Sequence, residues 1–378
     1  MRSPDDSVSP HIPALDGIRA LAILLVIPHN VDVIGNSYPA VVFPLVALMH
    51  AGWIGVQLFF VLSGFLITGN LLDTRSAGNY YSAFILRRAL RILPLYFGIL
   101  FTALVLAPLL VSPPDELRTT LHNQVWLWTF LSNWTAPYGG TVTGFSHFWS
   151  LAVEEQFYLL WPLVVARCRP ATLPWICSVI VGAALLTRWA LLRAHFSDDA
   201  LYMFTPARMD ALALGASAAA LVRTAGTRAR LQRMTGWIAV VGIMVLLVDA
   251  AVTQEFVSYN RRAQLYGYTL LALGFSLIML QLALPTAAAP GGAVRLLACK
   301  PLRLVGRYSY GMYVFHLPLH VYFGSRLLHG LAGHVTTGVA LVYTGAIVAV
   351  SFCAAAASYE LYERHFLSLK GLLMPRPA

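Results

Sequence analysis

Three ionisable side chains lie in stretches of the sequence that are otherwise apolar. Arg19 and His29 enclose nine uncharged residues, and Glu154 follows an aromatic stretch that begins at Ser146. Ionisable groups inside a membrane segment cost free energy, so they usually mark a site or a pathway. An imidazole beside a carboxylate can take a proton from a hydroxyl group, which indicates general acid–base chemistry. The structural alternative is that Arg19 reaches the membrane interface, His29 hydrogen-bonds a neighbouring helix and Glu154 forms a salt bridge.

A second candidate group is basic. Arg88 and Arg91 lie three residues apart in LRRALRILPLY, so a helix would present both on one face at the cytoplasmic membrane edge. Guanidinium groups bind phosphate through paired hydrogen bonds, and this pair is therefore a candidate phosphate clamp. Anchoring by positive charge at the cytoplasmic side is the alternative.

A third group lies near the end of the chain. Tyr310, Tyr313 and His316 recur every third residue, which places them along one face of a helix. Such a stripe contributes either to a site or to packing between helices. Arg208 and Asp210, earlier in the chain, are explained by an ion pair within or between helices.

The composition indicates a membrane protein built of helices. Of the 378 residues, 58% are hydrophobic and 11% are charged, and the mean hydropathy is +0.69. Soluble domains carry about 25% charged residues. We therefore predict an all-α, polytopic membrane protein with about ten transmembrane helices. The predicted spans are residues 18–36, 45–72, 90–111, 147–166, 173–194, 206–223, 235–253, 265–285, 303–324 and 335–358.

The net charge of +10 reports membrane topology rather than binding to nucleic acid. The amino terminus, the even-numbered loops and the carboxyl tail hold 18 of the 26 Lys and Arg residues, whereas the odd-numbered loops hold five. This asymmetry places both termini in the cytoplasm. His29 and Glu154 then fall within about one helical turn of each other in membrane depth, which would allow them to meet.

This topology divides the chain into a disordered cytoplasmic tail at 1–13, an integral membrane domain at 14–364 and a cytoplasmic tail at 365–378. Arg outnumbers Lys by 24 to 2, which points to a GC-rich bacterial genome and hence to the bacterial cytoplasmic (inner) membrane. The four Cys residues form no CxxC pair, so neither a disulfide framework nor a thiolate metal site is indicated.

Five blocks, spread over almost the whole chain, carry a resemblance to a known family. They are LDGIRALAILLVIPH at 15–29, GVQLFFVLSGFLIT at 55–68, RRALRILPLY at 87–96, HFWSLAVEEQFYLLWP at 147–162 and GRYSYGMYVFHLPL at 306–319. With these blocks in this order, the chain resembles acyltransferase family 3, whose integral membrane proteins move acyl groups onto sugars, lipids, peptidoglycan or antibiotics. The resemblance implies ten spans, acyl-CoA as co-substrate without a bound cofactor, and a hydroxyl-bearing acceptor.

The resemblance also implies roles for single residues. The essential Arg and His of the family's first block match Arg19 and His29, and the Glu of its fourth block matches Glu154. Its RxxR pair matches Arg88 and Arg91. Further residues expected to bind substrate or acyl-CoA are Ser150, Tyr158, Tyr313 and His316. The family usually has ten residues between the Arg and the His; here nine leave His29 about 80° away from the face of Arg19, and we expect Pro28 to restore the geometry.

We therefore predict an O-acyltransferase that moves an acyl group, acetyl by default, from acyl-CoA to a hydroxyl of a carbohydrate, a cell-envelope glycan or a macrolide-type small molecule. His29 would act as the base and Glu154 would orient it, while Arg19 would bind the donor or the developing oxyanion. A covalent acyl-histidine intermediate is an open alternative. The competing class is a proton-coupled transporter or flippase, which intramembrane His and Glu residues also suit, although the sequence has no convincing internal repeat.

Overall fold

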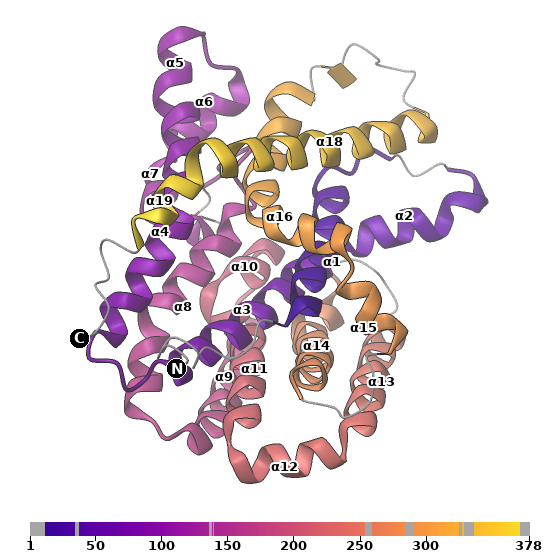
Figure 1. Ribbon diagram of the computed structural model, residues 1–378. Coiled ribbons are helices and arrows are strands. Elements are labelled where there is room, and N and C mark those ends of the chain that lie inside the picture. Colours follow the sequence, from indigo (N-terminus) through magenta and orange to yellow (C-terminus); the bar gives the residue numbers. More distant parts are fainter. Residues whose placement is uncertain are drawn as a thin grey trace. The chain divides into compact units, whose positions relative to one another are not determined.

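The computed structural model describes residues 12–34, 38–135, 138, 140–253, 259–284, 291–324, 327–328 and 336–370. These residues are almost entirely helical and include no strand, which confirms the all-α prediction (Figure 1). Residues 1–11 and 371–378, which make up most of the two predicted tails, lie outside the described residues.

The chain forms two compact units, each assembled from segments that are far apart in the sequence. The first unit comprises residues 1–18, 56–81 and 153–303, and the second comprises residues 19–55, 82–152 and 304–378. Several helices, including the one that carries Ser150 and Glu154, continue from one unit into the other. The two units are described separately below.

The first unit is built around α11, a helix rich in Ala and Gly. Its helices are α3 (Ile54–Asp73), the second half of α8 (Phe148–Arg167), α9 (Leu173–Arg193), α10 (Asp198–Met203), α11 (Thr205–Arg223), α12 (Ala225–Arg233), α13 (Thr235–Thr253), α14 (Tyr268–Ala283) and α15 (Gly292–Leu297). Small side chains let α11 pack against both α9 and α14 (Figure 1). A Cβ added at Gly64 of α3 would lie 2.0 Å from the carbonyl oxygen of Leu212 in α11, so these two backbones are in direct contact.

We expect Gly64→Ala to lower the free energy of unfolding by about 1–3 kcal/mol, because the new methyl group can be accommodated only if α3 and α11 move apart. Gly182→Ala in α9 is the matched control, since nothing lies within 4 Å of a Cβ at that position. Denaturation of both variants in one detergent provides the comparison. Equal stability of the two variants would contradict the close contact.

The second unit contains the remaining helices. They are α1 (Pro13–Asn30), α2 (Phe43–His50), α4 (Tyr80–Phe101), α5 (Ala107–Leu110), α6 (Asp115–His122), α7 (Val125–Trp128), α16 (Lys300–Leu319), α18 (Thr337–Ser358) and α19 (Arg364–Ser368). The first two residues of α3 also belong to this unit, and Gly55 brings them against α1, because a Cβ there would lie 2.5 Å from the carbonyl oxygen of Ala22. Gly311 likewise brings α16 against Ala355 of α18.

Six described helical segments are long and apolar enough to cross a membrane. They are Ala40–Asp73, Tyr80–Leu110, Pro170–Arg193, Thr235–Thr253, Ala263–Ala283 and Thr337–Ser368. The other four predicted spans correspond to α1, α8, α11 and α16, which have 18 to 20 residues but are not among the segments that are apolar enough. The count of ten is therefore not confirmed. Three of these four helices, α1, α8 and α16, carry most of the predicted site residues.

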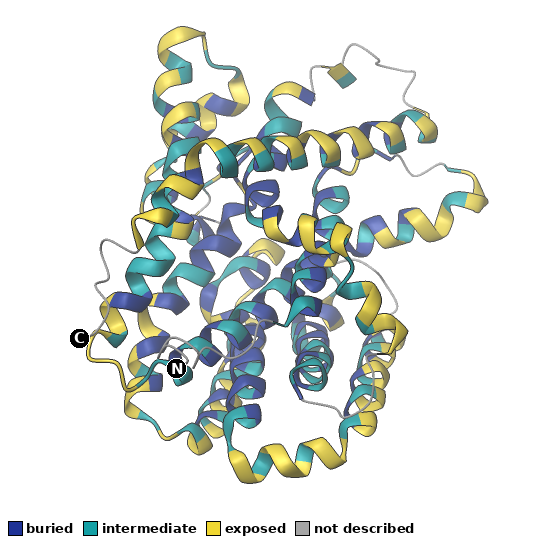
Figure 2. Ribbon diagram, in the orientation of Figure 1, coloured by how far each residue is buried: buried dark blue, intermediate teal, exposed yellow. Residues whose placement is uncertain are grey.

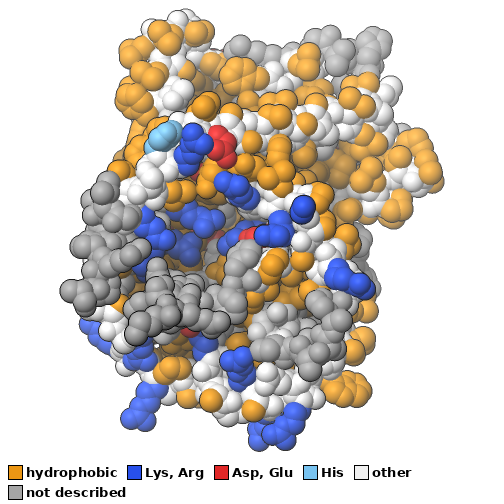
Figure 3. All heavy atoms as spheres, in the orientation of Figure 1, with side chains coloured by type: hydrophobic (Ala, Val, Ile, Leu, Met, Phe, Trp, Pro, Cys, Tyr) orange, Lys and Arg blue, Asp and Glu red, His pale blue; other side chains and the backbone are white. Residues whose placement is uncertain are grey.

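Several of the six apolar segments expose hydrophobic side chains instead of burying them. Val342 and Val350 of α18 are 74% and 49% exposed, and hydrophobic side chains cover the visible surface of this helix (Figure 3). By contrast, α12 has no buried residue and is rich in Arg (Figure 2). Exposed apolar helices of this length suit lipid contact, and an exposed basic helix suits a loop in water.

Candidate functional site

The carboxyl end of α1 positions His29 in the second unit. The helix continues through Pro28 without interruption, so this proline does not break it. The His29 ring interacts with the backbone of Met49 and His50. Gly52 permits this approach, because a Cβ at that position would lie 2.7 Å from the Cβ of His29. The site therefore depends on a glycine at this crossing.

A carboxylate lies three residues beyond His29. Asp32 follows the end of α1, and its Oδ2 lies 2.9 Å from Nε2 of His50. Its other oxygen accepts a hydrogen bond from the backbone N–H of Ile34. Asp32 also interacts electrostatically with His29. A carboxylate that can stabilise a positive charge on His29 is thus present within the second unit itself.

His316 of α16 is tied to the residue next to His29. Its Nε2 lies 2.9 Å from Nδ2 of Asn30, and its Nδ1 lies 2.7 Å from the carbonyl oxygen of Tyr313. A carbonyl oxygen can only accept, so Nδ1 carries the hydrogen and Nε2 accepts from the Asn30 amide. These contacts set the tautomer of His316 and connect α16 with the end of α1.

Two hydroxyl groups extend this cluster. Tyr313 Oη donates to the carbonyl oxygen of His147 at 2.7 Å, and it lies 2.7 Å from Ser150 Oγ. Because the phenol has one hydrogen, Ser150 is the donor in the second bond. The ring of His147 lies 4.7 Å, centroid to centroid, from that of His316. The structure thus brings together three residues that the sequence predicted for the site, namely Ser150, Tyr313 and His316.

Glu154 lies in the first unit, where two hydroxyl groups bind it. Ser63 Oγ donates to Oε1 at 2.7 Å, and Tyr158 Oη donates to Oε2 at 2.8 Å. Tyr158 is one helical turn from Glu154 in α8, so these two predicted site residues are in contact. The expected contact between Glu154 and His29 would join the two units and stays a prediction.

The residues predicted to hold acyl-CoA lie on other parts of the second unit. Arg88 and Arg91 are both in α4, so the helix required for a shared face is present. The guanidinium of Arg88 lies 5.8 Å from the centroid of the Phe84 ring, one turn earlier. Arg19 is half-buried in α1. Among the described residues, no group of three or more His, Cys, Asp or Glu side chains could hold a metal ion.

Asn30, Asp32 and His147 were not among the residues predicted for the site. Asn30 follows His29 by one residue and Asp32 follows it by three. Both are polar side chains within one helical turn of His29, and this proximity was the signal in the sequence. His147 is the first residue of the block HFWSLAVEE. Within this block, Glu154 was predicted for the site and His147 was not. The structure shows the relevance of these three residues through their contacts, which are Asn30 with His316, Asp32 with His50 and His147 with His316.

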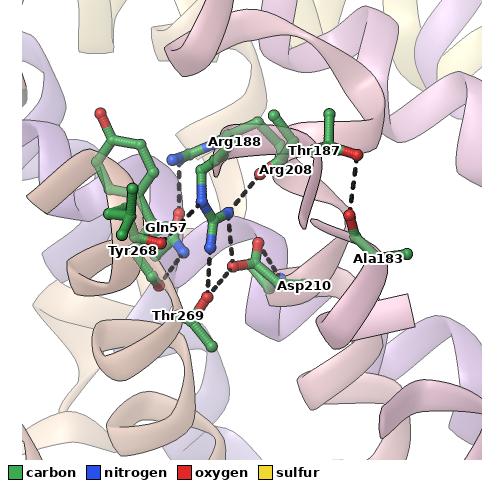
Figure 4. Close-up of polar contacts among 11 residues, drawn as sticks. Gln57, Ala183, Thr187, Arg188, Arg208, Asp210, Tyr268 and Thr269 are labelled. Atoms are coloured by element: carbon green, nitrogen blue, oxygen red, sulfur yellow. Dashed lines mark hydrogen bonds and ion pairs between the residues drawn. The ribbon is translucent and has the colours of Figure 1, made fainter. Parts of the chain in front are cut away.

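A second polar network lies in the first unit and joins α9, α11 and α14 (Figure 4). Arg188 and Asp210 are both fully buried and form an ion pair of 2.9 Å. Thr269 Oγ1 lies 2.5 Å from both the Arg188 guanidinium and the Asp210 carboxylate. Asp210 therefore takes part in an interhelical ion pair, one of the two arrangements expected from the sequence.

Arg208 lies beside this pair and is also fully buried. It donates to Gln57 Oε1 at 2.6 Å, and Gln57 in turn donates to the Tyr268 carbonyl oxygen (Figure 4). The guanidinium carbon lies 4.3 Å from the Tyr268 ring centroid and 4.9 Å from that of Tyr202. Burial raises the pKa of Tyr202 to about 12, so this ring faces Arg208 as a neutral phenol. The network fixes the packing of the first unit.

Comparison with known proteins agrees with the family that the sequence blocks indicate. The profile of an acyltransferase domain, that of acyltransferase family 3, matches residues 12–357. The chain belongs to acyltransferase family 3. Within the family, it is 25% identical over 344 residues to the O-acetyltransferase OatA of Staphylococcus aureus, a match that covers 85% of this chain and 52% of the relative. It is also 25% identical over 346 residues to the peptidoglycan O-acetyltransferase OatA of Listeria monocytogenes, covering 82% of this chain and 49% of the relative.

The chain thus spans about half the length of the curated relatives it matches. No solved structure shows a significant match. By family the chain is an acyltransferase domain, and its described residues include six helical segments long and apolar enough to cross a membrane. The family also favours the enzyme over the transporter that the sequence left open.

Proposed function

We propose that this O-acyltransferase takes an acyl group, acetyl by default, from acyl-CoA and transfers it to a hydroxyl of a cell-envelope glycan. The observation that carries this proposal is the family match over residues 12–357, together with relatives named as peptidoglycan O-acetyltransferases. Other carbohydrates and macrolide-type small molecules are the alternative acceptors. The membrane is proposed to be the bacterial cytoplasmic membrane, crossed ten times, with both termini in the cytoplasm.

The proposed reaction needs a base and a way to stabilise charge at the carbonyl group. The acceptor oxygen bonds to the acyl carbon while the bond from that carbon to the CoA sulfur breaks. His29 takes the hydroxyl proton and passes it to the departing thiolate, so no net proton is produced. Asp32, three residues beyond His29, is a carboxylate of the same unit and is proposed to stabilise the imidazolium that forms.

The remaining predicted residues are proposed to have different roles according to their charge. Arg88 and Arg91 are proposed to hold the CoA phosphates, and Arg19 to bind the donor or the developing oxyanion. Glu154 holds the hydroxyl groups of Ser63 and Tyr158 and is proposed to act with His29.

The purified chain is expected to release free CoA from acetyl-CoA when an acceptor is present. Soluble glycan strands of peptidoglycan, unrelated oligosaccharides and a macrolide form the acceptor panel, and mass spectrometry of the acceptor detects the added acetyl group. Release that depends on the glycan strands would support the proposed acceptor. Acetylation of the macrolide alone would overturn that acceptor while leaving the donor intact, and absence of release with folded protein and every acceptor would overturn acetyl-CoA as donor.

A further inference from the structure

A cationic surface lies at one end of the first unit, where the carboxyl ends of three helices meet. Both carboxylate oxygens of Asp73, the last residue of α3, accept hydrogen bonds of 2.7 Å from Arg223, the last residue of α11. Arg75, two residues beyond α3, donates at 2.8 Å to the carbonyl oxygen of Ala166 near the end of α8. The ends of α3, α8 and α11 therefore lie side by side, together with the segments that follow them.

Five exposed arginine side chains belong to this end of the unit, and we call them the arginine surface. They are Arg167, Arg169, Arg228, Arg230 and Arg233. Three of the five are in α12, which buries no residue (Figure 2). Within residues 70–80, 164–175 and 220–240, which make up the three helix ends and their connections, Asp73 is the only carboxylate, and Arg223 occupies both of its oxygens. These segments thus supply no further carboxylate to neutralise the arginine surface.

Two exposed tryptophans mark the depth at which lipid begins beside this surface. Trp175 is the third residue of α9 and is 75% exposed, and Trp237 is the third residue of α13 and is 71% exposed. Both helices belong to segments that are long and apolar enough to cross a membrane. Tryptophan at the end of such a segment is typical of the membrane interface, where its ring lies among the lipid headgroups.

The arginines come directly before these rings in the chain. Arg169 precedes Trp175 by six residues, and Arg233 precedes Trp237 by four. From Trp237 to Val248, every exposed side chain of α13 is apolar. Cations, an aromatic ring and an apolar face thus follow one another along the chain. This order matches the order of headgroups, interface and acyl chains in one leaflet of a membrane.

We propose that the arginine surface binds the headgroup phosphates of anionic phospholipids. Guanidinium groups bind phosphate through paired hydrogen bonds, and clusters of basic residues next to a membrane helix attract negatively charged lipid. On the predicted topology, this lipid belongs to the cytoplasmic leaflet. The inference goes beyond acyl transfer, and it depends on neither the proposed donor nor the proposed acceptor. Topology alone would require positive charge at this end but no affinity for a headgroup, and the experiment separates the two.

The experiment removes three positive charges from either end of the first unit. The Gln variant combines Arg228→Gln, Arg230→Gln and Arg233→Gln, and the Lys variant replaces the same three residues by Lys. The control variant combines Arg193→Gln, Arg261→Gln and Arg262→Gln. These three side chains are also exposed, but they lie at the opposite ends of α9 and α13. The Gln variant and the control variant therefore lose the same net charge at different places.

Melting temperatures are measured in an uncharged detergent with increasing phosphatidylglycerol, which is anionic. Phosphatidylcholine and inorganic phosphate serve as comparisons. We expect phosphatidylglycerol alone to raise the melting temperature of the wild type. The Gln variant should need at least about tenfold more phosphatidylglycerol for half of this rise, whereas the Lys variant and the control variant should stay within about threefold of the wild type. Salt at about 0.5 M should weaken the effect, because exposed charges are screened.

The other outcomes contradict the proposal. A wild-type response that is absent, or equal for phosphatidylcholine, would show no preference for an anionic headgroup. Equal protection by inorganic phosphate would show a site for the free anion instead of lipid. Equal losses in the Gln variant and the control variant would show that only net charge matters. Without lipid, the Gln variant should melt near the wild-type temperature, because α12 buries no residue.

The wild type and the Lys variant keep the proposal testable if the Gln variant proves unstable. A wild-type lipid effect that salt does not weaken would not depend on charge, and the arginine surface would then not be its cause. A Lys variant that is folded but no longer responds to phosphatidylglycerol would show that positive charge at this place is insufficient, which also overturns the proposal.

Discussion

Replacing His29 with glutamine or alanine is expected to lower the rate of acyl transfer by about 10²- to 10⁴-fold, the usual effect of removing a positioned general base. The physical reason is that the variant lacks the proposed base, so the hydroxyl hydrogen is not removed efficiently as the acyl carbon is attacked. His29→Gln is the sharper variant, since an amide keeps hydrogen-bonding capacity toward the backbone of Met49 and His50 but cannot take up a proton. The rate of CoA release at saturating acetyl-CoA and acceptor measures the effect.

Two further measurements make this result interpretable. Melting temperatures of both variants must stay near the wild-type value, which shows that the crossing at Gly52 is intact. His122→Gln in α6 serves as the matched control, because its side chain is exposed. Turnover by folded His29→Gln within about threefold of wild type would exclude His29 as the base.

Arg188→Met is expected to lower the free energy of unfolding by about 3–5 kcal/mol, the largest stability effect that we predict. The substitution leaves the carboxylate of Asp210 fully buried without its cation, with Thr269 as a remaining donor. Removing both charges should cost less than removing one, so the double variant Arg188→Met with Asp210→Leu should recover part of the stability. Chemical denaturation in a single detergent measures all three proteins.

An exposed pair provides the contrast. Arg364 and Glu360 form an ion pair of 2.8 Å, one turn apart, with side chains that are 55% and 44% exposed. The same substitution, Arg364→Met, should change the free energy of unfolding by no more than about 0.5 kcal/mol. If Arg188→Met were equally mild, the network of Figure 4 would not fix the packing of the first unit.

Several features of this protein could be predicted from the sequence because they depend on local composition. A helix was predicted at 235–253 and the structure has one at Thr235–Thr253, since a long apolar segment in lipid must satisfy its own backbone hydrogen bonds. The helix that carries Arg88 and Arg91, the all-helical class and the family also follow from short stretches of sequence. The family can be recognised from the sequence because each of its blocks is a contiguous segment of the chain.

The polar partners were decided by the tertiary structure. Asn30 and His316 are 286 residues apart, and Asp210 lies two residues from Arg208 but pairs with Arg188 of another helix. The sequence contains the donors and acceptors but not the packing that brings them together, and in an apolar interior each polar group must find whichever partner the packed helices place within reach. The same reason explains why His147 was missed, because its contacts with Tyr313 and His316 exist only once α16 is packed beside it.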